Sequence, residues 1–174
     1  MWLFSKKPRF PGVKENTDGT IDFTLTDEEK LKADLALQTF KGLLVHPEVA
    51  DKVRNGTIAV ALSHYANELI STDYHNVTKS EFKAKWPTIQ RNIEKAVAAV
   101  WKSYSLNPLP VFLYQRAVFL QSLGMKDQSR QIFSLFILKQ SEFHADDVDK
   151  ALMSYEGTDI ERALTHARER METP

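Results

Sequence analysis

The feature of this chain that most constrains its fold is an apolar stretch at residues 108–143. The first half of the stretch carries apolar side chains at helical spacing, and the second half is apolar around most of the circumference of a helix. We therefore predict two helices, at residues 109–123 and 127–143, joined at Leu123-Gly124-Met125. Because a helix that is apolar on all sides is usually buried on more than one side, this hairpin is expected at the centre of the protein.

The chain from residue 26 onward also has helical patterns. Its apolar spacing predicts helices at residues 26–46, 47–54, 57–73, 79–85, 87–104, 146–155 and 158–170. Three capping boxes begin at Thr26, Thr78 and Thr158, where a threonine and a glutamate three residues later can satisfy the first amides of a helix. Asn55-Gly56 and Pro87 are expected to interrupt helices. These patterns predict a single α-helical domain over residues 26–171.

Residues 1–25 differ from the rest and are expected to form a non-helical N-terminal arm. Pro8, Pro11 and Gly12 break any helix, and residues 20–25 alternate between apolar and polar side chains. This alternation predicts a short strand, either paired with residues 10–14 in a small hairpin or extended over the helical domain. The aromatic and basic residues of the arm suit packing on its own domain, or docking on a partner or a membrane surface.

The composition excludes several classes of protein. Cysteine is absent, which rules out disulfide bonds, thiolate metal sites and thiol catalysis. The net charge is zero, which gives no overall attraction to nucleic acid, although residues 79–102 are mainly basic and residues 142–172 mainly acidic. No run reaches the length of a membrane span, and the first residues lack the pattern of a secretory signal. We therefore expect a cytoplasmic protein with no cofactor, no membrane span and no nucleic-acid partner.

Small residues recur at a regular spacing in the C-terminal half. Ala117 and Ala151 are 34 residues apart in the sequence, and Ser129 and Ala163 are also 34 residues apart. Small residues allow two helices to approach closely, and this spacing matches the period of about 34 residues, with paired helices, that is typical of tetratricopeptide repeats. Residues 79–171 thus resemble tetratricopeptide-repeat (TPR) proteins, which implies stacked helical hairpins. The other architecture that fits the sequence is an irregular multi-helix bundle.

The histidines offer one candidate metal site. His64 and Glu68 have the i, i+4 spacing that brings two ligands to one face of a helix, and His75 follows soon after. This trio is the candidate for a small helical metal-binding protein or enzyme. The alternative is a partly exposed histidine that is hydrogen-bonded to its neighbour. An acidic cluster at residues 144–149 lacks the glycine and spacing of a calcium loop and suits the first turn of a helix.

The sequence favours a non-enzymatic protein-interaction or scaffolding module over an enzyme, because we find no catalytic signature in it. Such a module would bind a peptide or helix of a partner protein in a groove between helices. The resemblance to tetratricopeptide repeats places Tyr114, Gln115, Phe119 and Lys150 on the helices that would line this groove. A homodimer formed through the central hairpin or the N-terminal arm is the alternative, and the metal-binding protein or enzyme is a third possibility.

Overall fold

The computed structural model describes residues 12–18, 21–24, 26–28, 47–71 and 77–172. Over these residues the chain forms the helices α2 (Pro47–Ile70), α3 (Lys79–Leu106), α4 (Pro110–Ser122), α5 (Lys126–Glu142), α6 (Asp147–Glu156) and α7 (Ile160–Glu172). Two three-residue strands, β1 (Val13–Glu15) and β2 (Ile21–Phe23), pair antiparallel with Lys14 opposite Asp22. The all-α prediction is confirmed. Residues 1–11 of the predicted arm and most of the predicted helix 26–46 lie outside the described residues.

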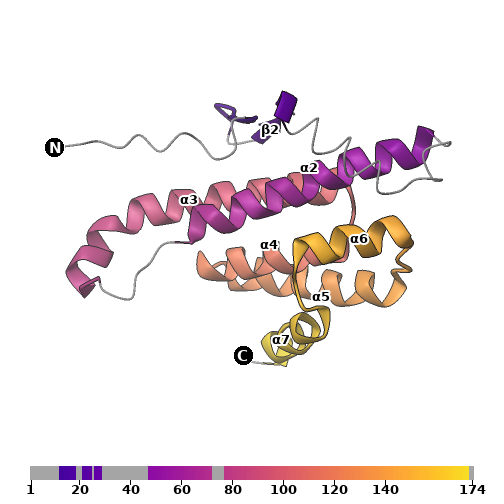
Figure 1. The fold of residues 1–174 in the computed structure, drawn as a ribbon. Coiled ribbons are helices and arrows are strands. Elements are labelled where there is room, and N and C mark those ends of the chain that lie inside the picture. Colours follow the sequence, from indigo (N-terminus) through magenta and orange to yellow (C-terminus); the bar gives the residue numbers. More distant parts are fainter. Residues whose placement is uncertain (1–11, 19–20, 25, 29–46, 72–76, 173–174) are drawn as a thin grey trace.

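The helices pack in two layers with α7 below them (Figure 1). The long antiparallel pair α2 and α3 forms the upper layer, with β2 against α3, and the α4–α5 hairpin lies beneath and contacts α3 through α4. Helix α6 returns to pack against α2, and α7 packs against α5 and α4. None of the described helices is long and apolar enough to span a membrane. The core residues come from every described helix and form two clusters, both of which include residues of α4.

The central hairpin forms as predicted. Helix α4 is covered by α3, α5 and α7, and its apolar side chains are among the most buried of the described residues. Gly124 adopts a left-handed backbone with φ of 77°, which favours glycine and turns the chain between the two helices. The Ser129 hydroxyl donates to the Ala117 carbonyl at 2.8 Å, so these two small residues mark a close crossing of α4 and α5.

Helix α2 corrects the predicted interruption at Asn55-Gly56. The helix runs without a break from Pro47 to Ile70, and Gly56 is buried inside it. A Cβ atom at Gly56 would lie 2.3 Å from Leu152 Cδ1 on α6 and 2.8 Å from Asn107 Nδ2. The glycine therefore serves close packing between helices rather than the end of a helix.

Helix α3 corrects the predicted break at Pro87. One helix spans Lys79–Leu106 with Pro87 inside it, and it bends near its N-terminal end (Figure 1). A proline within a helix removes one hydrogen bond and bends the axis without always ending it. The predicted capping box at the start of α3 is confirmed, because the Thr78 side chain accepts from the Glu81 amide and Glu81 accepts from the Thr78 amide.

The last two helices do not pack on each other as a third hairpin. Helix α6 lies along α2, whereas α7 lies along α5. Ala163 belongs to the core cluster that α7 forms with α4 and α5, and not to a crossing with α6. Small residues that recur at the regular spacing therefore have different neighbours in the structure. This arrangement argues against a regular three-hairpin stack.

The predicted capping box at Thr158 is wrong. The amide and the hydroxyl of Thr158 both donate to Glu156 at the end of α6, so the Thr158 amide does not pair with Glu161 as a capping box requires. Asp159 instead accepts from the Arg162 amide at the start of this helix. The cap of α7 is therefore one residue further along the chain than the sequence indicated.

Candidate interaction surface

The four residues predicted to line a partner groove do not share one surface. Gln115 and Phe119 are buried in the core, where the Ser63 hydroxyl donates to Gln115 at 2.8 Å. Tyr114 is half-buried against α7. Of the four residues only Lys150, which forms a salt bridge with Asp147, is exposed. Because α4 is packed on several sides, its side chains are not accessible to a partner in the way that the repeat phase predicted.

The predicted metal trio is only partly described by the structure. His64 is exposed on α2 and Glu68 is half-buried one turn later, whereas His75 lies outside the described residues. Among the residues that the structure describes, no group of three histidine, aspartate or glutamate side chains is placed to hold a metal ion. The carboxylates of the acidic cluster have structural contacts instead, since Asp146 and Asp149 form a capping box for α6 and both bind Lys52 of α2.

An open apolar groove lies between α5 and α7. Helix α5 buries Phe133 and Phe136 against α4, but its apolar residues continue around the helix to Ile137 and Leu138. Ile137 is half-buried and Leu138 is 51% exposed. The apolar circumference noted in the sequence is therefore covered only in part, and the uncovered part faces the groove.

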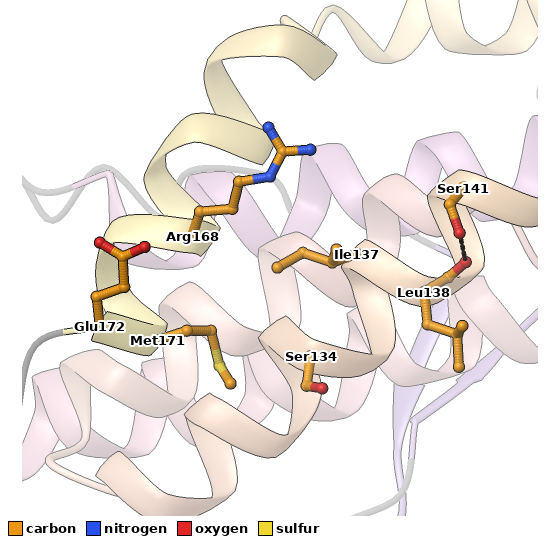
Figure 2. Close-up of a pocket in the computed structure, with 7 residues that line it drawn as sticks. All are labelled: Ser134, Ile137, Leu138, Ser141, Arg168, Met171 and Glu172. Carbon is orange, nitrogen blue, oxygen red and sulfur yellow. Dashed lines mark hydrogen bonds between the residues drawn. The ribbon is translucent and has the colours of Figure 1, made fainter.

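The groove has a volume of about 450 Å³ and is formed by two helices alone. Figure 2 shows its lining, which comprises Ser134, Ile137, Leu138, Ser141, Arg168, Met171 and Glu172. Ile137 on α5 points toward α7, and Met171 on α7, which is 40% exposed, reaches toward α5 (Figure 2). The lining is thus apolar in the middle with polar and charged groups at the rim, which is the composition expected of a peptide-binding surface.

Helix α7 is held in place by small residues and one aromatic cluster. Ala163 and Ala167 are buried and allow α7 to approach α5. On the same side, the Tyr114 hydroxyl lies 3.0 Å from His166 Nδ1, and the rings of Tyr114 and Phe133 pack edge-on against His166. The wall of the groove that α7 provides therefore depends on contacts with both α4 and α5.

His166 is neutral in this arrangement. Arg170 Nε donates to His166 Nε2 at 3.0 Å, so Nε2 cannot carry a proton, and we assign the ring proton to Nδ1, which donates to Tyr114. Burial, together with the charge of Arg170, lowers the pKa of His166, and burial raises the pKa of Tyr114. Both effects favour the uncharged forms of the pair that fixes α7.

The charges at the rim give the groove a polarity. Arg168 and Glu172 lie one turn apart on α7, and neither forms a salt bridge with any other residue in the described part of the chain. A ligand with an apolar face and a carboxylate could cover the apolar middle of the groove and place the carboxylate near Arg168. Among the lining residues no serine forms a hydrogen bond with a side-chain base in the described part of the chain, since the Ser141 hydroxyl donates to the Leu138 carbonyl.

Sequence reasoning did not single out Leu138 and Met171, the two exposed apolar residues of the groove. The available signal was the apolar excess of residues 132–138, which predicts burial on more than one side. That signal predicts core burial, and spacing alone does not give the position of α7, which leaves one side of α5 open.

Comparisons with known proteins found no match for this chain. No protein-family model matches this chain, and no curated protein or solved structure shows significant similarity to it. The surface described above therefore has to be interpreted from its own geometry.

Proposed function

We propose that this protein is a non-enzymatic interaction module that binds a short amphipathic helix or peptide of a partner protein in the groove between α5 and α7. The observation that carries this proposal is the pair of exposed apolar side chains, Leu138 and Met171, on the two walls of one groove. Helix-in-groove recognition uses apolar anchors of this kind, surrounded by polar groups that set orientation.

The energy available at the groove is consistent with weak to moderate binding. Full burial of a leucine or methionine side chain contributes about 1.5–3 kcal/mol, and Leu138 is only half covered in the free protein. Covering the rest of Leu138 and Met171 would then contribute about 1 kcal/mol for each side chain. The remaining affinity has to come from the partner's side chains that fill the groove and from a carboxylate near Arg168.

The test is to select peptides that bind the wild-type chain from a displayed peptide library and to measure them against two variants. Leu138→Glu places a charge in the groove and should weaken selected binders more than about tenfold, because a desolvated charge costs more than the lost apolar contact. Tyr155→Glu is the matched control, because Tyr155 is a largely exposed aromatic residue on α6 outside this groove. It should leave binding unchanged.

Two results would contradict the proposal. If selected peptides bind Leu138→Glu as tightly as wild type, the groove is not the binding surface. If light scattering shows a dimer that Leu138→Glu converts to a monomer, the exposed apolar side chains belong to a homodimer interface instead, which is the alternative that the sequence left open.

A further inference from the structure

A second surface is formed by the first three turns of α3, far along the chain from the α5–α7 groove. The side of α3 that packs in the core repeats every three or four residues, at Ile93, Ala96 and Val100. Extending the same spacing toward the N-terminus reaches Ile89 and Trp86, and one turn earlier Phe82. The apolar seam between α2 and α3 therefore continues along α3 into its first turns.

Burial along this seam decreases toward the start of α3. Ile93 is buried, Ile89 is half-buried, and Trp86 is 36% exposed. Figure 1 shows that this part of α3 extends past the end of α2, which stops at Ile70. The indole of Trp86 thus lies in line with a helix–helix seam, at a position where α2 no longer covers it.

The same turns of α3 carry a concentrated positive charge. Lys79, Lys83 and Lys85 are all exposed, and none of the three forms a salt bridge with another residue that the structure describes. Glu81, the one acidic residue among them, is already hydrogen-bonded to the Thr78 amide and hydroxyl. At 100° per residue, Lys79 and Lys85 lie on opposite sides of the line through Trp86 and Ile89.

We propose that the first three turns of α3 are a docking surface for an acidic amphipathic helix of a partner protein, laid along the extension of the α2–α3 seam. A helix fits because the apolar stripe is one side chain wide and has the spacing of a seam that α2 already occupies further along. An acidic helix fits because lysines flank the stripe on both sides. This surface is separate from the α5–α7 groove and does not depend on it.

The observations favour this partner over the two other candidates. A second copy of the chain, related by a two-fold axis at this surface, would place the lysine clusters of the two chains against each other. A bilayer is the weaker candidate, because stable membrane binding needs a large buried apolar area as well as a basic patch, and this apolar stripe is only one side chain wide. An oppositely charged helix covers the indole and also neutralises the lysines.

The experiment uses the full chain and a designed probe. The probe is a fluorescein-labelled helical peptide with alternating alanine and leucine at the spacing of Ala59, Leu62 and Ala66, flanked by glutamates. The control peptide has lysines in place of the glutamates. Fluorescence anisotropy should show at least about tenfold tighter binding of the acidic peptide, and this preference should decline as NaCl is raised.

Charge reversal at Lys79, Lys83 and Lys85, each to glutamate, should weaken binding of the acidic peptide by about tenfold or more, and Trp86→Ala should do so independently. The matched control reverses three exposed cations elsewhere, with Arg54→Glu, Lys126→Glu and Lys150→Glu, and should change binding less than about twofold. Circular dichroism establishes that each variant is folded before its binding is compared.

Three results would overturn the proposal. The first is equal binding of the acidic and basic peptides, and the second is equal loss of binding in the two triple variants. The third is co-sedimentation of the chain with vesicles of phosphatidylcholine and phosphatidylserine, lost with Trp86→Ala, while the acidic peptide does not bind. That outcome would assign the surface to a membrane.

Discussion

Gly56→Ala is the substitution that tests the packing of α6 against α2 most directly. In an exposed helix this change would stabilise the protein by about 0.5–1 kcal/mol, because alanine loses less backbone entropy on folding. At Gly56 the new Cβ atom would lie 2.3 Å from Leu152 Cδ1, more than 1 Å closer than the ~3.5–4.0 Å of carbon–carbon van der Waals contact. Leu152 is only 5% exposed, so its side chain has little room to move away.

The magnitude follows from these two opposing effects. Overpacking a core by one methyl group costs about 1–3 kcal/mol, and the buried Asn107 amide, 2.8 Å from the same position, adds a second obstacle. The packing cost therefore exceeds the gain in helix propensity. We expect Gly56→Ala to lower the free energy of unfolding by about 1–2 kcal/mol.

Urea denaturation followed by circular dichroism measures this difference. The control is a double-mutant cycle with Leu152→Ala, which alone should cost about 2–5 kcal/mol but makes room for the new Cβ atom. The two substitutions together should then cost at least about 1 kcal/mol less than the sum of their separate effects. If Gly56→Ala instead stabilises the protein by the full propensity gain, α6 does not lie against Gly56 and the described arrangement of α2 and α6 is wrong.

Two further predictions concern the contacts that hold α6 and α7. Glu156→Gln should destabilise the protein by about 1–3 kcal/mol in urea denaturation, because the two oxygens of the buried carboxylate accept from the Thr158 amide, the Thr158 hydroxyl and the Gln115 amide, and glutamine has one acceptor oxygen in place of two. The exposed Glu161→Gln should change the stability by less than about 0.5 kcal/mol, and equal effects would contradict the role of the buried carboxylate. Burial and the charge of Arg170 lower the pKa of His166 in the folded protein. The neutral ring therefore stabilises the fold fully above pH ~6.5, and this contribution declines as the pH falls toward the lowered folded pKa. The free energy of unfolding should therefore fall less between pH 7.5 and 5.5 in His166→Gln than in wild type, and identical pH profiles would show that the ring is not held neutral by the fold.

Elements governed by local signals were predictable from the sequence. The start of α3 was predicted from Thr78 and Glu81, which satisfy the first amides of the helix within four residues of sequence. The α4–α5 turn was predicted because Gly124 follows the apolar run and supplies the left-handed backbone that the turn needs. In each case the atoms that decide the structure are neighbours in the chain, so spacing and residue type carry the information.

Elements decided by distant contacts were not predictable in this way. Asn55-Gly56 is a turn signal by composition, but the bare Cα of Gly56 is needed for Leu152, which is nearly a hundred residues away in the chain. Ala163 is small because α7 crosses α5, and its regular spacing from Ser129 does not reflect an equivalent pair of neighbours. The same error placed Gln115 and Phe119 on a surface, because the repeat phase assumes a stack in which one side of α4 stays open.

The two proposed binding surfaces differ from ordinary exposed apolar residues in where their side chains lie relative to neighbouring helices. Single apolar side chains on a surface are normal and imply nothing by themselves, and Tyr155, at 68% exposure, is an example. Trp86 differs because it continues the buried stripe of α3 past the end of α2, and that stripe is already shaped for a helix, since its buried part contacts α2. Leu138 differs because it lies beside Ile137 in a groove whose other wall is a second helix, α7. Position beside a neighbouring helix, rather than the degree of exposure, is therefore the property that should predict which substitutions on this protein affect binding.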